Sequence, residues 1–123
     1  MKFQLGQFKR FEKQIILKKI GLTGQKKLLS SKVLIIGMGG LGCPLLTYLT
    51  ASGVGKIGIV DHDKIEISNL NRQTLFNIND IGKYKVDQAK KIIKKTNKAI
   101  NIFSYKKKIT KENINKISKS NNK

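Results

Sequence analysis

The chain has 123 residues, with 26 basic against seven acidic side chains, which gives a formal net charge of +19. This length suits one domain and excludes a large multidomain machine. Its single cysteine, Cys43, excludes an internal disulfide framework and a zinc site built from several cysteines of this chain. We therefore expect a reduced, cytoplasmic setting.

The positive charge raises nucleic acid and anionic membranes as partners. Only Arg10 and Arg72 are arginines, however, and the other basic residues are lysines. Because arginine makes the better bidentate contacts with phosphates and bases, compositional drift explains the charge better than nucleic-acid binding does. Residues 56–87 hold five acids and five bases, so the excess lies outside them. We expect no nucleic acid and no membrane as partners.

The first part of the chain predicts short helices followed by a strand. Residues 8–20 are basic and amphipathic, which predicts a short helix. A second short helix is predicted over residues 25–29, so that residues 1–31 form an N-terminal helical arm. The apolar, β-branched run over residues 32–36 predicts a strand buried on both faces, as in parallel sheets.

No charged side chain occurs between residues 33 and 55, a stretch long enough to span a bilayer. Six glycines and Pro44 interrupt it, which favours a strand, a glycine turn and a helix over a membrane helix. We predict that helix over residues 41–52, with Gly53 as its C-terminal cap. A second strand over residues 56–60 completes a βαβ unit with parallel strands.

The remaining chain predicts one more strand and two more helices. Residues 65–79 are polar and irregular, which indicates an exposed loop. An amphipathic helix is predicted over residues 82–97, a strand over 99–105, and a last helix capped by Thr110. The expected fold class is α/β, a Rossmann-like parallel sheet with flanking helices over residues 32–123.

A glycine-rich turn follows the first predicted strand and opens a helix. Its pattern, Gly37-x-Gly39-x-x-Gly42, stands in the context that a nucleotide-binding motif requires. Glycines let the backbone approach a phosphate, and a helix N-terminus supplies free N–H donors. Asp61 ends the second strand at the spacing of a carboxylate that binds ribose hydroxyls. A turn that only packs helix on strand is the alternative, and the combined pattern favours a nucleotide.

The glycine motif alone suits NAD and FAD as well as ATP. The segment over residues 68–73, Ser-Asn-Leu-Asn-Arg-Gln, shifts the balance. A triphosphate needs cations near its β- and γ-phosphates, and Arg72 and Lys85 can supply them. The sequence therefore favours ATP.

Several short segments match one family in order. They lie at residues 10–16, 24–28, 33–42, 51–55, 61–63, 68–73 and 81–86. In these segments the chain resembles the N-terminal portion of the ThiF/MoeB family, relatives of ubiquitin-activating enzymes. The resemblance implies an ATP-dependent adenylyltransferase that uses Mg²⁺. Such an enzyme joins AMP to the C-terminal Gly-Gly carboxylate of a ubiquitin-like sulfur carrier protein of the molybdopterin or thiamine type.

The resemblance also implies which residues act. The nucleotide-binding residues would be Gly37, Gly39, Gly40, Gly42, Asp61, Asp63, Ser68, Asn69, Leu70, Asn71, Arg72 and Lys85. Arg72 and Lys85 would also be catalytic, because cations neutralise the charge that develops in the transition state. Lys13 would be a third catalytic residue, in the place of a family arginine that reaches into a partner subunit's site. No metal ligand from the protein is predicted.

Family members continue with a strand ending in Asp-Asn, a crossover loop and two Cys-x-x-Cys pairs, which do not occur in these residues. We therefore expect a truncated domain whose third strand has an open edge, and a homodimer or a complementing chain as partner. Whether this portion is active alone stays open. One alternative is a non-catalytic nucleotide- or partner-binding module of the same fold. A basic nucleic-acid-binding domain is a less favoured third hypothesis.

Overall fold

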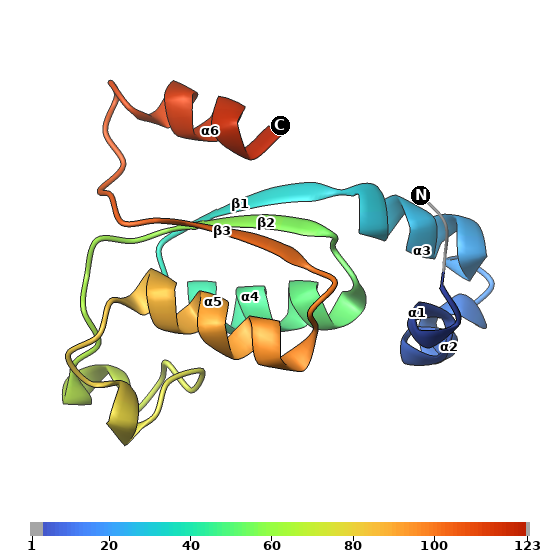
Figure 1. Ribbon diagram of the computed structural model, residues 1–123, viewed down its shortest axis with the longest axis horizontal. Helices are drawn as coiled ribbons and strands as arrows, with labels where there is room; N and C mark the ends of the chain where they lie inside the picture. The colour runs from blue at the N-terminus through green and yellow to red at the C-terminus, as the bar shows by residue number, and fades with distance from the viewer. Residues whose placement is uncertain (1–3, 123) are drawn as a thin grey trace.

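The computed structural model describes residues 4–122 (Figure 1). Three helices come first and are α1 (Leu5–Arg10), α2 (Glu12–Ile15) and α3 (Gly21–Ser30). Strands and helices then alternate as β1 (Lys32–Ile36), α4 (Gly42–Ser52), β2 (Lys56–Val60), α5 (Lys85–Thr96), β3 (Asn101–Tyr105) and α6 (Ile114–Asn122). Two 3-10 turns, η1 (Ile67–Asn69) and η2 (Ile78–Asp80), lie between β2 and α5.

The three strands form one parallel sheet in the order β1-β2-β3. Parallel neighbours need a crossover connection, and here α4 and α5 supply the two crossovers. Figure 1 shows α4 and α5 on one face of the sheet and α6 on the other. The predicted α/β, Rossmann-like architecture is confirmed.

The hydrophobic core lies between the sheet and the pair α4 and α5. Ile57 and Ile59 of β2 are completely buried there, together with Leu46 of α4 and Val86 of α5. The outer face is less covered, and Ile36 at the end of β1 is 54% exposed. The prediction that the first strand is buried on both faces is therefore wrong, because α6 covers only part of the outer face.

A glycine lets α6 approach the outer face of the sheet. A Cβ on Gly58 would overlap Oδ1 of Asn121, so only glycine leaves room for that side chain. Nδ2 of Asn121 donates to the carbonyl of Val33 at 3.0 Å. The contact anchors the last turn of α6 across β1 and β2.

Several local predictions need correction. The helix expected over residues 8–20 is divided at Phe11, whose ring is buried, and ends at Ile15. The helix expected over residues 25–29 is longer and runs from Gly21 to Ser30 as α3. The loop expected to be exposed over residues 65–79 is partly internal, because Gln73 and Phe76 are buried. The physical reason is the same in each case, since tertiary packing outweighs local propensity.

Other local predictions are confirmed. Gly53 ends α4 with φ of 101°, the left-handed conformation of a C-terminal cap. Oγ1 of Thr110 accepts from the backbone N–H of Asn113 at 3.2 Å, just before α6. Residues 33–55 fold as strand, turn and helix, and among residues 4–122 no helix has the length and apolar character needed to cross a membrane.

Candidate nucleotide-binding site

The turn between β1 and α4 presents unused backbone donors. Gly37 has φ of 96°, a conformation that favours glycine. A Cβ on Gly42 would overlap the carbonyl oxygen of Gly37, so the turn closes only with glycine there. The N–H groups of Gly39, Gly40 and Leu41 find no acceptor among residues 4–122. Free N–H groups ahead of a helix form a receptor for an anion.

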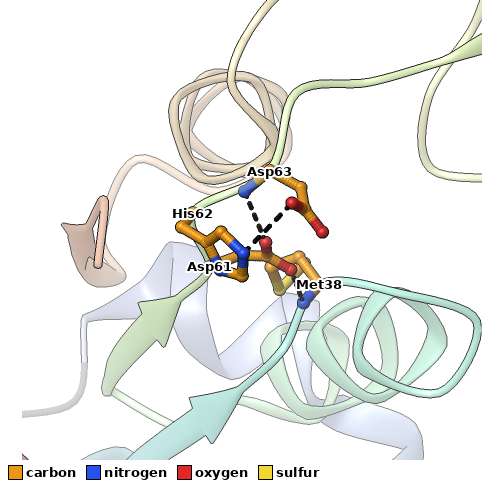
Figure 2. A network of polar contacts seen from close by, with 4 residues as sticks. All are labelled: Met38, Asp61, His62 and Asp63. Atoms are coloured by element: carbon orange, nitrogen blue, oxygen red, sulfur yellow. Dashed lines mark hydrogen bonds and ion pairs between the residues drawn. The ribbon is translucent and has the colours of Figure 1, made fainter. Parts of the chain in front are cut away.

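Asp61 ties the end of β2 to this turn. One carboxylate oxygen, Oδ2, accepts from the N–H of Met38 at 2.7 Å, and Oδ1 accepts from the N–H of Asp63 at 2.8 Å (Figure 2). Nε2 of His62 lies 3.3 Å from Oδ1 of Asp63, but both side chains are more than half exposed, so this pair contributes little. Asp61 therefore fixes the turn and retains lone pairs for a further donor such as a ribose hydroxyl.

Arg72 packs on the turn and is oriented by its own segment. Its Nη1 donates to the carbonyl of Ser68 at 3.2 Å and to Oδ1 of Asn71 at 3.0 Å. Its Cδ lies 3.5 Å from the place where a Cβ on Gly40 would stand. The remaining guanidinium donors point to no acceptor among the described residues, so they are available to a ligand.

Lys85 is the unusual charge of the site. It begins α5, is only 6% exposed, and its ammonium has no hydrogen bond or ion pair within residues 4–122. It lines a polar pocket of about 150 Å³ together with Asp63, Lys64, Glu66 and Asn69. The stem of Lys85 is buried, whereas its ammonium is not among the fully buried polar atoms that lack a partner. An anionic ligand in this pocket would give the ammonium a counter-ion.

A larger pocket of about 280 Å³ lies at the carboxyl ends of the strands. It is lined by Ile36, Gly37, Val60, Asp61, His62, Asp63, Lys107, Lys108 and Ile109. In open parallel sheets, ligands bind outside the carboxyl ends of the strands. The segment after β3, with Lys107 and Lys108, was missed from the sequence, although its place after a third parallel strand was a usable signal.

The structure brings most of the predicted site residues together. Gly37, Asp61 and Asp63 line the larger pocket, and Asn69 and Lys85 line the polar one. Ser68 and Asn71 accept from Arg72. Leu70 packs against the core instead of lining a pocket, which makes it a structural part of the segment.

Lys13 is not part of this assembly. It lies exposed on α2, which Figure 1 places at the amino ends of the strands, opposite the glycine turn. Its predicted catalytic role stays a prediction that concerns a second subunit.

Cys43 does not supply a nucleophile to this site. The thiol is buried in the first turn of α4 and donates to the carbonyl of Met38 at 3.4 Å. Burial raises the pKa of Cys43 to about 11, although the nearby charge of Lys85 lowers it in part. A neutral thiol is neither a nucleophile nor a metal ligand at neutral pH.

The sequence matches the ThiF family over residues 11–122. The chain belongs to the ThiF family. Its relatives include the adenylyltransferase and sulfurtransferase UBA4 of Scheffersomyces stipitis, which is 49% identical over 104 residues, or 84% of this chain and 24% of that protein. A probable molybdopterin-synthase adenylyltransferase of Porphyra purpurea is 51% identical over 100 residues, or 81% of this chain and 26% of that protein.

Solved structures place this ThiF-family chain beside proteins crystallised with nucleotides. Escherichia coli MccB with AMPCPP and MccA is 37% identical, with a TM-score of 0.73 over 76% of this chain and 28% of that chain. The E. coli tRNA N6-threonylcarbamoyladenosine dehydratase TcdA with ATP has a TM-score of 0.90 over 97% of this chain and 48% of that chain. At 19% identity this second likeness concerns the fold alone. The chain spans about a quarter of the length of the curated relatives it matches.

Proposed function

We propose that this chain is the ATP-binding portion of an adenylyltransferase that activates the C-terminal carboxylate of a ubiquitin-like sulfur carrier protein. The observation that carries the proposal is Lys85, whose mostly buried side chain brings an unpaired ammonium to a polar pocket, together with a glycine turn that has three free N–H donors among residues 4–122. The relatives named adenylyltransferases support it. The name of the Porphyra relative favours the molybdopterin type of carrier over the thiamine type.

Each group has a part in this chemistry. Attack by a carboxylate on the α-phosphate brings two anions together, forms a bond from the carboxylate oxygen to phosphorus and releases pyrophosphate. Arg72 and Lys85 would offset the charge that develops on the phosphates. The free N–H groups of the turn would bind a phosphate oxygen, and Asp61 would orient the ribose.

Mg²⁺ fits this site as a companion of the phosphates. Both oxygens of Asp61 already accept backbone N–H groups, whereas the exposed carboxylate of Asp63 lines both pockets. Protein-bound Mg²⁺ commonly uses one or two carboxylates together with substrate phosphates. We therefore assign Asp63 as the carboxylate toward Mg²⁺, which when bound would supply further charge neutralisation.

The proposed function predicts a selective thermal shift. With ATP and Mg²⁺ at about 100 times the dissociation constant, the free energy of unfolding rises by about 2.7 kcal/mol, because only the folded state binds. NAD at the same concentration is expected to give no shift. The measurement is the melting temperature by differential scanning calorimetry, with salt held constant. A shift with NAD and none with ATP would show that ATP is the wrong nucleotide for this site.

The same preparation separates the enzyme from a non-catalytic module. ATP binding together with exchange of labelled pyrophosphate into ATP, in the presence of a carrier ending in Gly-Gly, is the expected result for an adenylyltransferase. ATP binding without exchange, even after a complementing chain is added, would leave the binding module as the function.

β3 lies at an edge of the sheet, as expected for the third strand, and β1 lies at the other edge. A complementing chain is proposed at the free edge of β1. The carbonyl of Ser31 accepts from Lys56 and the N–H of Gly37 donates to Val60, so the backbone groups of Leu34 and Ile36 point away from β2. No strand among residues 4–122 pairs with them. Unpaired edges of this kind bind further strands. Since the relatives are about four times longer, the proposed occupant is a further strand of the kind that their remaining length could supply.

This edge predicts a defined pattern of hydrogen exchange. The amide N–H groups of Leu34 and Ile36 should exchange as fast as free ones, while those of Ile57 and Ile59 in the central strand are protected. Exchange followed by NMR measures both sets. Protection of the first pair that increases with protein concentration would instead indicate a homodimer through this edge. Protection at every concentration would contradict a free edge.

A further inference from the structure

A second side chain of the Arg72 segment lies on the glycine turn. Gln73 is 2% exposed, and its Nε2 lies 3.9 Å from where a Cβ on Gly39 would stand. Its backbone N–H donates to the carbonyl of Asn69 at 2.9 Å, which fixes the start of the side chain. Consecutive residues therefore cover consecutive glycines, with Arg72 on Gly40 and Gln73 on Gly39.

The amide of Gln73 is buried without being used. Its Nε2 donates to nothing within residues 4–122, so this donor is available to a ligand. Its Oε1 is fully buried and also has no hydrogen-bond partner, but an amide oxygen only accepts, so the proposal rests on Nε2. The other completely buried glutamine, Gln25, shows the contrast, because its Nε2 donates to Ser52 and its Oε1 accepts from Gln14.

We propose that Gln73 is a further nucleotide-binding residue, whose side-chain amide donates from Nε2 to a phosphate oxygen beside Gly39. The inference rests on the proposed function. Its chemistry complements that of Arg72 and Lys85, since a neutral amide donates a hydrogen bond without adding charge. Burial holds the amide in place before the ligand arrives, so little side-chain entropy is lost on binding.

The test compares ATP with adenosine, which lacks phosphates. In Gln73→Met, which keeps the length of the side chain, we expect ATP to bind about 5-fold more weakly, because one neutral hydrogen bond is lost. Gln73→Glu places a carboxylate against the phosphates, and we expect ATP to bind about 100-fold more weakly. Adenosine should bind both variants as it binds the wild type. Isothermal titration calorimetry measures all the dissociation constants.

The matched control is Gln25→Met, a buried glutamine far from the turn. It should lower the melting temperature and leave the ratio of the ATP and adenosine dissociation constants unchanged. If both Gln73 variants weaken ATP and adenosine equally, or neither, Gln73 is only a packing residue and the inference fails while the proposed function stands. If the wild type binds no ATP, the proposed function and this inference fail together.

Discussion

Replacing Lys85 by methionine should remove most of the affinity for ATP and leave the fold intact. The ammonium stands unpaired at the polar pocket, and hydrogen bonds to charged groups contribute about 2 kcal/mol, so ATP should bind about 30-fold more weakly. Methionine fills a similar volume without a charge. The free protein should melt at nearly the same temperature, because the ammonium makes no hydrogen bond or ion pair within residues 4–122 that the change would remove.

Lys83→Met provides the matched control for this change. Lys83 lies two residues earlier, is exposed, and lines neither of the two pockets of the site. It should bind ATP as the wild type does, so that loss of affinity cannot be ascribed to a lower net charge. Titration calorimetry and melting curves are needed for both variants. Wild-type affinity in Lys85→Met would remove the observation on which the proposed function depends.

The sequence was sufficient for the strands and for the glycine turn because both depend on local chemistry. A β-branched run that ends in glycines favours a strand followed by a turn over other structures. The observed β1 and β2 coincide with the strands predicted over residues 32–36 and 56–60. The contact of Arg72 with Gly40 joins segments 32 positions apart, and the sequence indicated the role of Arg72 only through the needs of a triphosphate and the family resemblance.

What the sequence did not show depends on contacts between distant segments. The N-terminal helices divide at Phe11 because its ring packs against Gly53, 42 positions away along the chain. Lys107 and Lys108 enter the larger pocket only because β3 lies beside β2. No periodicity in the sequence indicates that Gln73 lies against Gly39. Such contacts are set by tertiary packing, which local patterns do not encode.

Two alanine substitutions in the glycine turn should have opposite consequences. In Gly42→Ala the added methyl would overlap the backbone carbonyl of Gly37, which has no flexible side chain to move aside. We expect the free energy of unfolding to fall by about 3 kcal/mol, as for other overpacked sites. In Gly40→Ala the nearest atom is Cδ of Arg72 at 3.5 Å, an ordinary contact, so the stability should change by less than about 0.5 kcal/mol.

Gly40→Ala, which should fold normally, is expected to weaken the binding of ATP. Gly40→Ala places a methyl where the backbone has to approach a phosphate, so ATP should bind about 10-fold more weakly at unchanged stability. Urea unfolding followed by circular dichroism gives the stability of each variant, and calorimetry gives the affinity of Gly40→Ala.

Because the two changes are chemically identical and two residues apart, their difference reports only the surroundings of each Cβ. Equal stability of Gly42→Ala and the wild type would mean that the turn does not close on Gly37 in solution. Full ATP affinity in Gly40→Ala would place the phosphates away from this turn.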